Sequence, residues 1–472
     1  MGLESPQHEC GVIGIFSPGK EVSQEIFYGL IALQNRGQEG SGIATVDENG
    51  KIYLRKDEGL VYAVYSKDDI ASLKGSIGVG HNRYGITGKS SKENAHPFLV
   101  DSDIGPFAFV HNGNIHNTLE LRKELAENGV KFDSSTDSEV VAQLIAKSSA
   151  KTMVGKIKEA APKIKGAYSC LIANKDSLIG FKDPRGVWPL SIGRFNGNGY
   201  IVASETNGIE KAGGSNCEDI NAGEIVVIDR EGARYDSLGR EQESLCSFEY
   251  YYFCDPYSKL LGRRVENARF DMGVALAEEH SFDADWIIPV PETARPAAEG
   301  YAFASKIPVR SALIRNRWLG RTFIEPSQRL RELAAELKYG SLPEIIEGKK
   351  IIVIDDTIVR GTTTKKLVKL VRNAGAKEVS VLSTAPPIRG VCWDGVDTAD
   401  LSELIAANKS IEEIRAFIGA DHLGYLSLEA GIKAIGLNLK DRLCISCFTG
   451  QYRMQIPNGR DKFILEGEKV HA

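Results

Sequence analysis

A chain of 472 residues is too long to fold around one ordinary hydrophobic core, and its length predicts two or three domains. Its 58 Lys and Arg against 63 Asp and Glu give a formal net charge of −5, which excludes a broad basic field for nucleic acid. No segment approaches the roughly 18 apolar residues of a membrane helix, and residues 1–9 lack the features of a secretory signal. We therefore expect a cytoplasmic protein without a membrane partner, whose eight cysteines have uses other than disulfides.

The first half, residues 10–245, predicts a sheet-rich layered domain. The apolar run at residues 12–16 is typical of a buried strand. Ile26, Leu30 and Leu33 then recur at helical spacing. The glycine-dense residues 35–42 predict a loop that lines a site. Further strand-like pieces stand at residues 75–80, 107–111, 171–173 and 201–203.

The second half, residues 246–472, predicts alternating strands and helices. Residues 286–290 and the apolar run 351–354 are typical of strands. A helical stripe then stops near Gly375, and residues 379–382 resume a strand. This βαβ order predicts a parallel sheet. Residues 402–417 predict a polar helix.

The sharpest motif is the segment 351–364, where an apolar strand ends in two carboxylates and a Thr/Gly loop opens a helix. Helix-start and loop amides offer unpaired donors to a phosphate, and Gly361 lets the backbone approach closely. Asp355 and Asp356 suit ribose hydroxyls or magnesium, because they would repel phosphate. The alternative is an ordinary strand-to-helix turn with acidic capping residues.

This segment resembles the ribose-phosphate loop of type I phosphoribosyltransferases. The resemblance implies that Asp355 and Asp356 serve the ribose and Mg²⁺, and it implies that Thr293, after an earlier strand, contacts the metal. The residues that it assigns to the phosphate are Val359, Arg360, Gly361, Thr362 and Thr363. The neighbouring Ala294-Arg295-Pro296 departs from the forms expected for the family's pyrophosphate loop.

Residues 315–331 hold five arginines among Gly and Pro breaks, which suits a lid over a polyanionic substrate. The phosphoribosyl pyrophosphate contacts expected in and after this region are Arg317 and Arg321, and then Lys338. A solvated basic surface loop is the alternative that composition leaves open.

Cys10 opens the first predicted strand, where a lone cysteine is more often a core thiol. Three further segments give it meaning, at residues 81–85, 111–114 and 135–139. Together they resemble the N-terminal-nucleophile glutaminase domain of several amidotransferases, closely over residues 10–139 and loosely to about 235.

The resemblance implies a role for each glutaminase residue. The thiolate of Cys10 attacks the glutamine amide, with its own α-amine, of pKa about 7.7–8.0, as the base. Asn112 and the amide of Gly113 form the oxyanion hole. Arg83 pairs with the glutamine carboxylate and Asp137 with its ammonium group. Because Cys10 is not first in the sequence, residues 1–9 are expected to be a propeptide that is removed.

Cys444 and Cys447 form a CxxC pair, a spacing that is weak evidence in isolation. Composition alone does not select their partners. A resemblance to the cluster-bearing branch of the amidophosphoribosyltransferase family does, because Cys246 precedes a Glu-Tyr-Tyr-Tyr-Phe segment and Cys392 follows Pro-Pro-Ile. Four thiolates suit a [4Fe–4S] cluster, and structural Zn²⁺ is the rival.

The motifs occur in the order of that family, and the resemblance covers nearly the whole chain. It implies an αββα glutaminase sandwich followed by a doubly wound transferase sheet, an α+β and an α/β domain. The implied reaction moves glutamine nitrogen onto phosphoribosyl pyrophosphate, at the first committed step of purine synthesis. Purine nucleotides as inhibitors and a homo-oligomer, a dimer or tetramer, are implied as well. The rivals are an amidotransferase for another acceptor and a non-catalytic regulator that senses phosphoribosyl pyrophosphate.

Overall fold

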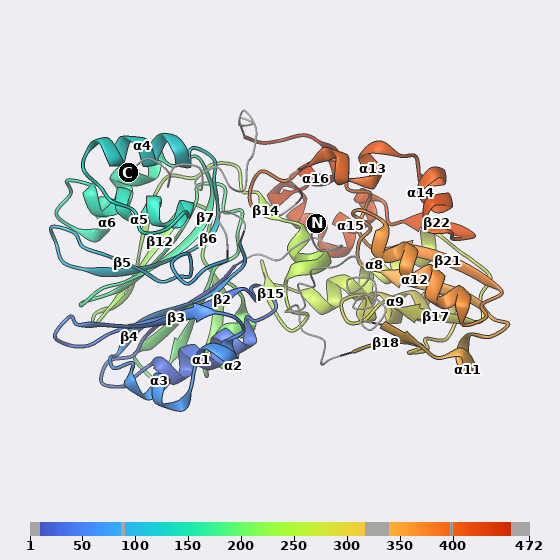
Figure 1. Ribbon diagram of the computed structural model, residues 1–472, viewed down its shortest axis with the longest axis horizontal. Helices are drawn as coiled ribbons and strands as arrows, with labels where there is room; N and C mark the ends of the chain where they lie inside the picture. Colours follow the sequence, from blue (N-terminus) through green and yellow to red (C-terminus); the bar gives the residue numbers. More distant parts are fainter. Residues whose placement is uncertain (1–9, 86–89, 317–338, 397, 399, 455–472) are drawn as a thin grey trace.

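The computed structural model describes residues 10–85, 90–316, 339–396, 398 and 400–454. Two bodies of different architecture lie side by side, a double-sheet half and a half built on a smaller sheet (Figure 1). The expected propeptide, and the expected lid contacts Arg317, Arg321 and Lys338, lie outside the described residues. No helix in the described ranges is long and apolar enough to cross a bilayer.

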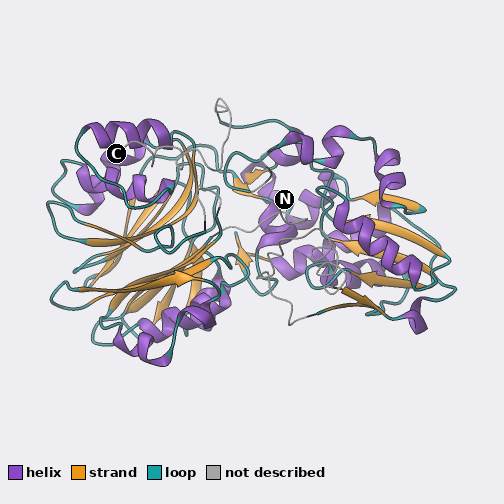
Figure 2. Ribbon diagram, in the orientation of Figure 1, coloured by secondary structure: helices purple, strands orange, loops and turns teal. Residues whose placement is uncertain are grey.

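The first half contains two stacked antiparallel sheets with helices outside each (Figure 2). The first sheet has the order β11-β9-β10-β1-β4-β2-β3 and the second the order β13-β12-β8-β7-β6-β5. The strands of the first are β1 (Gly11–Phe16), β2 (Gly40–Val46), β3 (Ile52–Glu58), β4 (Ile77–Arg83), β9 (Ser191–Phe195), β10 (Gly199–Ala203) and β11 (Ser215–Asp219). Those of the second are β5 (Phe98–Val100), β6 (Phe107–Ile115), β7 (Gly166–Ala173), β8 (Leu178–Lys182), β12 (Glu224–Asp229) and β13 (Gly232–Ser237).

Helices complete the four layers of this half. Those on the first sheet are α1 (Ser23–Ala32), α2 (Val61–Val64), α3 (Lys67–Ser72) and α7 (Thr206–Lys211). Those on the second are α4 (Thr118–Glu127), α5 (Asp137–Lys147) and α6 (Met153–Ala160), followed by the short turn η1 (Ala161–Lys163). The predicted αββα sandwich is confirmed.

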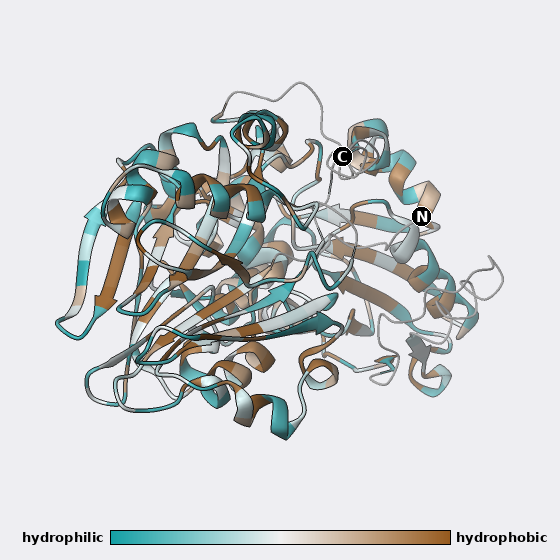
Figure 3. Ribbon diagram, turned by 60° about the vertical axis from the view of Figure 1, so that its left-hand side comes forward, coloured by the Kyte–Doolittle hydropathy of each residue, from teal (hydrophilic) through white to brown (hydrophobic). Residues whose placement is uncertain are grey.

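Strand β1 shows why its sequence is a continuous apolar run. Val12 packs between the two sheets, whereas Ile13 packs against the outer helices. Because successive side chains of a strand point to opposite faces, a strand covered on both faces needs apolar residues at every position. Hydrophobic residues accordingly follow the inner strands in Figure 3, with hydrophilic residues on the outer helix surfaces.

The second half is built on a parallel sheet of order β17-β20-β21-β22. Its strands are β17 (Trp286–Pro289), β20 (Lys350–Asp355), β21 (Glu378–Ser383) and β22 (His422–Tyr425). One face packs on α8 (Val265–Glu279), α9 (Arg295–Ser305) and α15 (Leu428–Ile435). The other packs on α12 (Thr362–Asn373), α13 (Ile405–Asn408) and α14 (Ile411–Ile418). The predicted doubly wound sheet is confirmed.

Short elements join the two halves and frame the second. The paired strands are β14 (Leu245–Cys246) with β23 (Leu443–Cys444), β15 (Lys259–Leu260) with β16 (Arg263–Arg264), and β18 (Leu313–Arg315) with β19 (Tyr339–Ser341). The short helical elements are η2 (Glu249–Phe253), α11 (Pro343–Ile346), η3 (Leu401–Glu403), η4 (Leu437–Arg442) and α16 (Ser446–Thr449).

Two sequence-based expectations were wrong in detail. The glycine-dense residues 35–42 do not form one loop, because Gly40 already begins β2 and pairs with Arg83 of β4. A side chain on Gly42 would collide with the carbonyl of His96, so the glycine serves close backbone approach inside the sheet. The expected helix 402–417 is instead η3, α13 and α14, because Ser410 starts a new helix with a capping box to Glu413.

Candidate active sites

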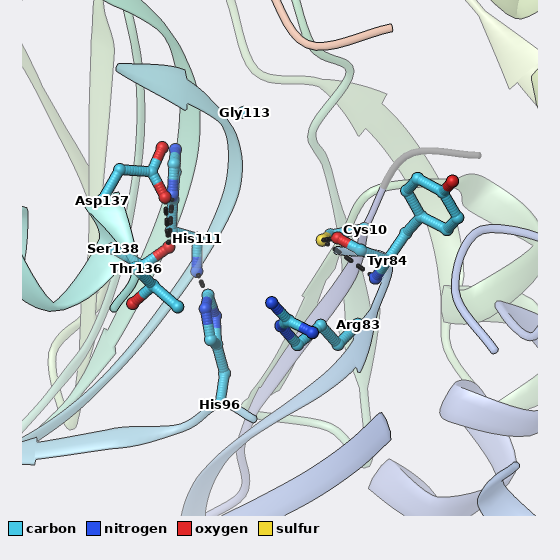
Figure 4. Close-up of a pocket in the computed structure, with 9 residues that line it drawn as sticks. All are labelled: Cys10, Arg83, Tyr84, His96, His111, Gly113, Thr136, Asp137 and Ser138. Carbon is cyan, nitrogen blue, oxygen red and sulfur yellow. Dashed lines mark hydrogen bonds between the residues drawn. The ribbon is translucent and has the colours of Figure 1, made fainter. Parts of the chain in front are cut away.

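Cys10 immediately precedes β1, and its side chain is 7% exposed. Pairing of β1 with β4 places Arg83 and Tyr84 next to it, because Gly11 lies opposite Asn82. The Cys10 thiol donates to the Tyr84 carbonyl oxygen at 3.4 Å, and the Tyr84 amide approaches the sulfur at 3.4 Å. The sheet thus holds the predicted nucleophile at the rim of a pocket (Figure 4).

This pocket collects residues from five separate segments of the first half. Its lining is Cys10, Arg83, Tyr84, His96, His111, Gly113, Thr136, Asp137 and Ser138. Figure 4 shows the Arg83 guanidinium on the side of Cys10 and the Asp137 carboxylate on the opposite side. A thiol, a cation and an anion therefore face one space, as the binding of a zwitterionic amino acid requires.

The predicted oxyanion-hole residues lie on β6. Asn112 is 0% exposed, yet neither its Nδ2 nor its Oδ1 has a hydrogen-bond partner within the described part of the chain. Buried amides are rarely left unsatisfied, so such a group requires an explanation. Gly113 follows at φ +148, a conformation that favours glycine, and lines the pocket. A side-chain amide with no partner, next to a pocket-lining glycine, suits a developing oxyanion.

The two predicted glutamine-binding residues are held in place by different interactions. Arg83 is 3% exposed and forms an ion pair with Glu39 at 3.5 Å. Asp137, the first residue of α5, accepts the Ile115 amide at 3.1 Å. Both side chains are therefore held in place before a ligand binds, which lowers the entropy cost of binding.

Three histidines at this site had no role in the sequence-based prediction. His81 and His96 stack with ring centroids 3.9 Å apart, and His111 binds the Ser138 hydroxyl oxygen at 2.9 Å. Burial lowers the pKa of His81 to about 3 and the pKa of His96 well below its ordinary value. Such weakly basic imidazoles are poor general bases at neutral pH. The α-amine of a terminal Cys10 fits that role better.

Sequence reasoning also missed Arg36. Its Nε donates to the Cys10 carbonyl oxygen at 3.2 Å, and its two Nη atoms pair with Glu205 at 3.0 Å and Glu249 at 2.7 Å. All three side chains are 0% exposed. No local pattern could have indicated this cluster, because its members lie in three distant segments.

The phosphoribosyl motif has the predicted strand, loop and helix. Asp355 ends β20 and Asp356 follows it, and the two are 7% and 9% exposed. Gly361 takes the left-handed conformation at φ +74 and caps α12, where a Cβ would collide with Ile405. The Thr362 hydroxyl is buried and has no hydrogen-bond partner among the described residues. A buried hydroxyl beside the amides of a helix start is typical of a phosphate cradle.

The side chains of two residues in the predicted phosphate loop make contacts away from the expected phosphate site. The side chain of Val359 is 6% exposed and packs in the core, so only its backbone is available to a ligand. Arg360 forms an ion pair with Glu403, with Nε and the carboxylate oxygen 3.2 Å apart.

The structure brings the three predicted magnesium contacts together. Burial raises the pKa of Asp356 to about 6, although hydrogen bonds from Thr357 and Thr293 and the charge of Arg269 lower it. Hydroxyl and carboxylate oxygens are hard donors that suit Mg²⁺. In the described ranges no three His, Cys, Asp or Glu side chains gather as a metal-binding group. Mg²⁺ often needs only one or two carboxylates, because substrate phosphates and water complete its shell.

The four predicted cluster cysteines line one cavity. Cys246 of β14 pairs with Cys444 of β23, and the amides of Arg389 and Gly390 both donate to the Cys447 carbonyl at 2.9 Å. These bonds bring three distant segments together at the junction of the halves. The residues around the cavity are Cys246, Phe248, Ile388, Cys392, Trp393, Asp394, Val396, Thr398, Cys444, Ser446, Cys447 and Tyr452. Four sulfurs in a mainly apolar wall are a soft donor set, although these described cysteines are not gathered as a metal-binding group in this structure.

A cysteine that opens an antiparallel double-sheet domain, beside a pocket for a zwitterion, defines the class of glutamine amidotransferases. Residues 81–211 match the family model described as a glutamine amidotransferase domain. The chain is 41% identical to the amidophosphoribosyltransferase of Methanothermobacter thermautotrophicus over 97% of each chain. It is 43% identical to that of Methanocaldococcus jannaschii, over 95% of this chain and 98% of the relative.

Solved structures agree with these relatives. The fold matches the glutamine phosphoribosylpyrophosphate amidotransferase of Bacillus subtilis complexed with ADP and GMP, with a TM-score of 0.90 and 40% identity. That match covers 96% of this chain and 99% of the other. The chain therefore belongs to the amidophosphoribosyltransferase family.

Proposed function

We propose that this enzyme hydrolyses glutamine at Cys10 and transfers the ammonia to C1 of phosphoribosyl pyrophosphate. The products are 5-phosphoribosylamine, pyrophosphate and glutamate, at the first committed step of purine synthesis. The observation that carries the proposal is the presence, in one chain of this family, of a thiol pocket for a zwitterion and a phosphate cradle beside two carboxylates.

In the glutaminase half, the α-amine of Cys10 takes the thiol proton after residues 1–9 are removed. The thiolate attacks the amide carbon, and Asn112 with the Gly113 amide stabilises the oxyanion. Collapse releases ammonia and leaves a thioester, which water then hydrolyses. Arg83 and Asp137 hold the carboxylate and ammonium of glutamine at opposite sides of the pocket.

In the transferase half, the α12 start and the Thr362 hydroxyl bind the 5′-phosphate. The backbone at Val359 and the residues Gly361 and Thr363 complete this cradle. Asp355, Asp356 and Thr293 would hold Mg²⁺, which neutralises charge on the departing pyrophosphate. Arg317, Arg321 and Lys338 are proposed to cover the substrate, and Arg360 to join them by exchanging Glu403 for phosphate.

Ammonia must reach C1 without mixing with solvent, because protonation by water would remove its nucleophilic lone pair. We therefore propose an internal route between the two halves. The direct contacts between the halves, such as the pairing of Arg36 with Glu249, support such a shared interior.

For Cys246, Cys392, Cys444 and Cys447 we propose a [4Fe–4S] cluster, with one thiolate on each iron. A structural Zn²⁺ would need all four sulfurs about 2.3 Å from one point. The cluster would tie the C-terminal segment to both halves and take no part in the transfer. Anaerobic purification followed by iron, sulfide and zinc analysis and a visible absorption spectrum distinguishes the two.

The proposal on inhibitors is based on a relative. The Bacillus subtilis structure contains ADP and GMP, and we propose that purine nucleotides inhibit this enzyme as well. Assembly as a dimer or tetramer and a cytoplasmic location stay predictions from the sequence.

The deciding experiment measures pyrophosphate release from phosphoribosyl pyrophosphate with Mg²⁺, supplied with glutamine or with an ammonium salt. The proposal expects release with either nitrogen source. Release with neither, in processed and iron-replete protein, would favour a sensing regulator. Glutaminase activity with a sugar phosphate acceptor instead would indicate another amidotransferase.

A further inference from the structure

A buried ion cluster crosses the junction of the halves next to the nucleophile. Arg36 follows α1 in the glutaminase half, whereas Glu249 belongs to η2 at the start of the transferase half. Glu249 accepts from both Nη atoms of Arg36, at 3.0 and 2.7 Å. Glu205 pairs with one Nη at 3.0 Å, and the Cys254 thiol donates to Glu249 at 2.9 Å.

The charge of Arg36 is compensated by the two carboxylates of this cluster. Burial alone would lower the pKa of Arg36, yet Glu249 and then Glu205 hold it well above its ordinary value. Arg36 therefore stays charged, and the fork of its guanidinium is oriented by a bidentate carboxylate. Its third donor, Nε, points at the Cys10 carbonyl.

The position of Cys10 gives this contact its importance. Once residues 1–9 are removed, Cys10 is the chain end and is tethered covalently on one side alone. Chain ends are poorly ordered unless noncovalent contacts hold them. A donor to the Cys10 carbonyl fixes the rotation of that residue, and with it the directions of the amine and the thiol.

The element that carries Glu249 is itself fixed from the transferase side. Arg269 of α8 donates to the carbonyls of Tyr250 and Cys254, both at 2.8 Å. The charge of Arg269 also acts on Asp356 of the phosphoribosyl site. Arg269 thus holds η2 by hydrogen bonds and acts on the phosphoribosyl site through its charge.

We propose that Glu249 is a positioning residue for the glutaminase, supplied by the transferase half, which orients Cys10 through Arg36. This inference rests on the proposed function. It goes further by making the glutaminase incomplete without η2 of the other half.

The test compares Glu249→Gln with Glu243→Gln in the full mature chain. Glu243 is a matched control, because it is also buried and forms a forked pair with Arg442, at 2.7 and 3.1 Å, without touching Arg36. Glutamine-dependent and ammonia-dependent rates are measured on the same preparations. For Glu249→Gln we expect kcat with glutamine to fall about tenfold, with KM for glutamine and the ammonia-dependent rate within about twofold of the parent.

Glu243→Gln should leave the ratio of the two rates unchanged. Glu249→Asp keeps the charge on a shorter side chain and should recover part of the lost kcat, and it decides the matter if Glu249→Gln does not fold. Equal losses of both rates, or an unchanged ratio in the Glu249 variants, would overturn the inference. A parent protein without either activity would instead refute the proposed function.

Discussion

The two active sites are built in contrasting ways. The phosphate cradle and the two carboxylates of the phosphoribosyl site come from one contiguous segment, in which β20, Asp355 and Asp356, Gly361 and the start of α12 follow each other. The glutamine pocket is assembled from residues that lie far apart in sequence. They meet because β1 pairs with β4 in one sheet and β6 belongs to the sheet stacked on it. A contiguous site depends on local backbone geometry, whereas an assembled site depends on the whole sandwich and on its junction with the other half.

The contrast predicts that damage to the glutamine pocket leaves ammonia-dependent transfer intact. The strongest case is Cys10→Ala, in a chain expressed to begin at residue 10 after its initiator methionine. We expect glutamine-dependent pyrophosphate release to fall at least about 10³-fold, because the nucleophile is gone. The ammonia-dependent rate should match the parent. Comparable rates with both nitrogen sources in this variant would contradict the role of Cys10.

The oxyanion hole should give the next largest effect. Asn112→Ala removes a buried amide without a described partner, and we expect kcat with glutamine to fall about 10²–10³-fold. KM for glutamine should change little, since Arg83 and Asp137 remain. Asn117→Ala serves as control, because Asn117 donates to the Lys163 carbonyl away from the pocket. Similar losses in both variants would indicate a structural role alone.

Acid should destabilise the glutaminase half in particular. Burial lowers the folded-state pKa of His81, to about 3, and of His96 and His111. As the pH falls through about 6.5, these histidines therefore bind protons in the unfolded chain but not in the folded chain. The stability that these neutral histidines contribute is fully present above about pH 6.5. It is lost as the pH falls towards their folded-state pKa values. His81 alone should cost about 1 kcal/mol between pH 6.5 and 5.5, and His96 and His111 add to the loss in the same direction.

Thermal unfolding of the glutaminase half checks this, because the midpoint should fall between those pH values, by about 2–4 °C from His81 alone. His96→Gln should reduce the fall. His422→Gln is the matched control, since its side chain is 49% exposed, and it should leave the fall unchanged. A midpoint independent of pH would mean that the histidines are not held neutral.

A smaller effect is expected at the contiguous site. Thr362→Val keeps the shape and removes a buried hydroxyl that has no described partner. If this hydroxyl binds phosphate, KM for phosphoribosyl pyrophosphate should rise about tenfold, as for a hydrogen bond to a charged group. Thr362→Ser should restore the parent value, and glutamine hydrolysis should be unaffected. An unchanged KM would exclude the hydroxyl from the site.

The same contrast explains what could be predicted from the sequence. The strand, the paired Asp355 and Asp356 and the helix start are read directly from consecutive residues, and the structure has all of them. The αββα order followed from the resemblance. The break at Ser410 also had a local signal, because Ser410 and Glu413 form a capping box spacing that the helical pattern obscured.

Arg36 and the three histidines illustrate what could not be predicted. Arg36 stands in a glycine-dense stretch, and its partners Glu205 and Glu249 are 169 and 213 residues away. Gly40 and Gly42 hide a strand, since a residue without a side chain contributes nothing to an alternating pattern. Only the stacking of the sheets and the contact between the halves bring these residues to the nucleophile.

The central claim is that one chain makes ammonia at Cys10 and consumes it at the phosphoribosyl site without releasing it. The most direct test supplies glutamine labelled with ¹⁵N in its amide, in a buffer that contains unlabelled ammonium, and measures the mass of the phosphoribosylamine formed. The account predicts a product that is almost fully labelled at early times. A product with the isotopic composition of the bulk ammonium would contradict it.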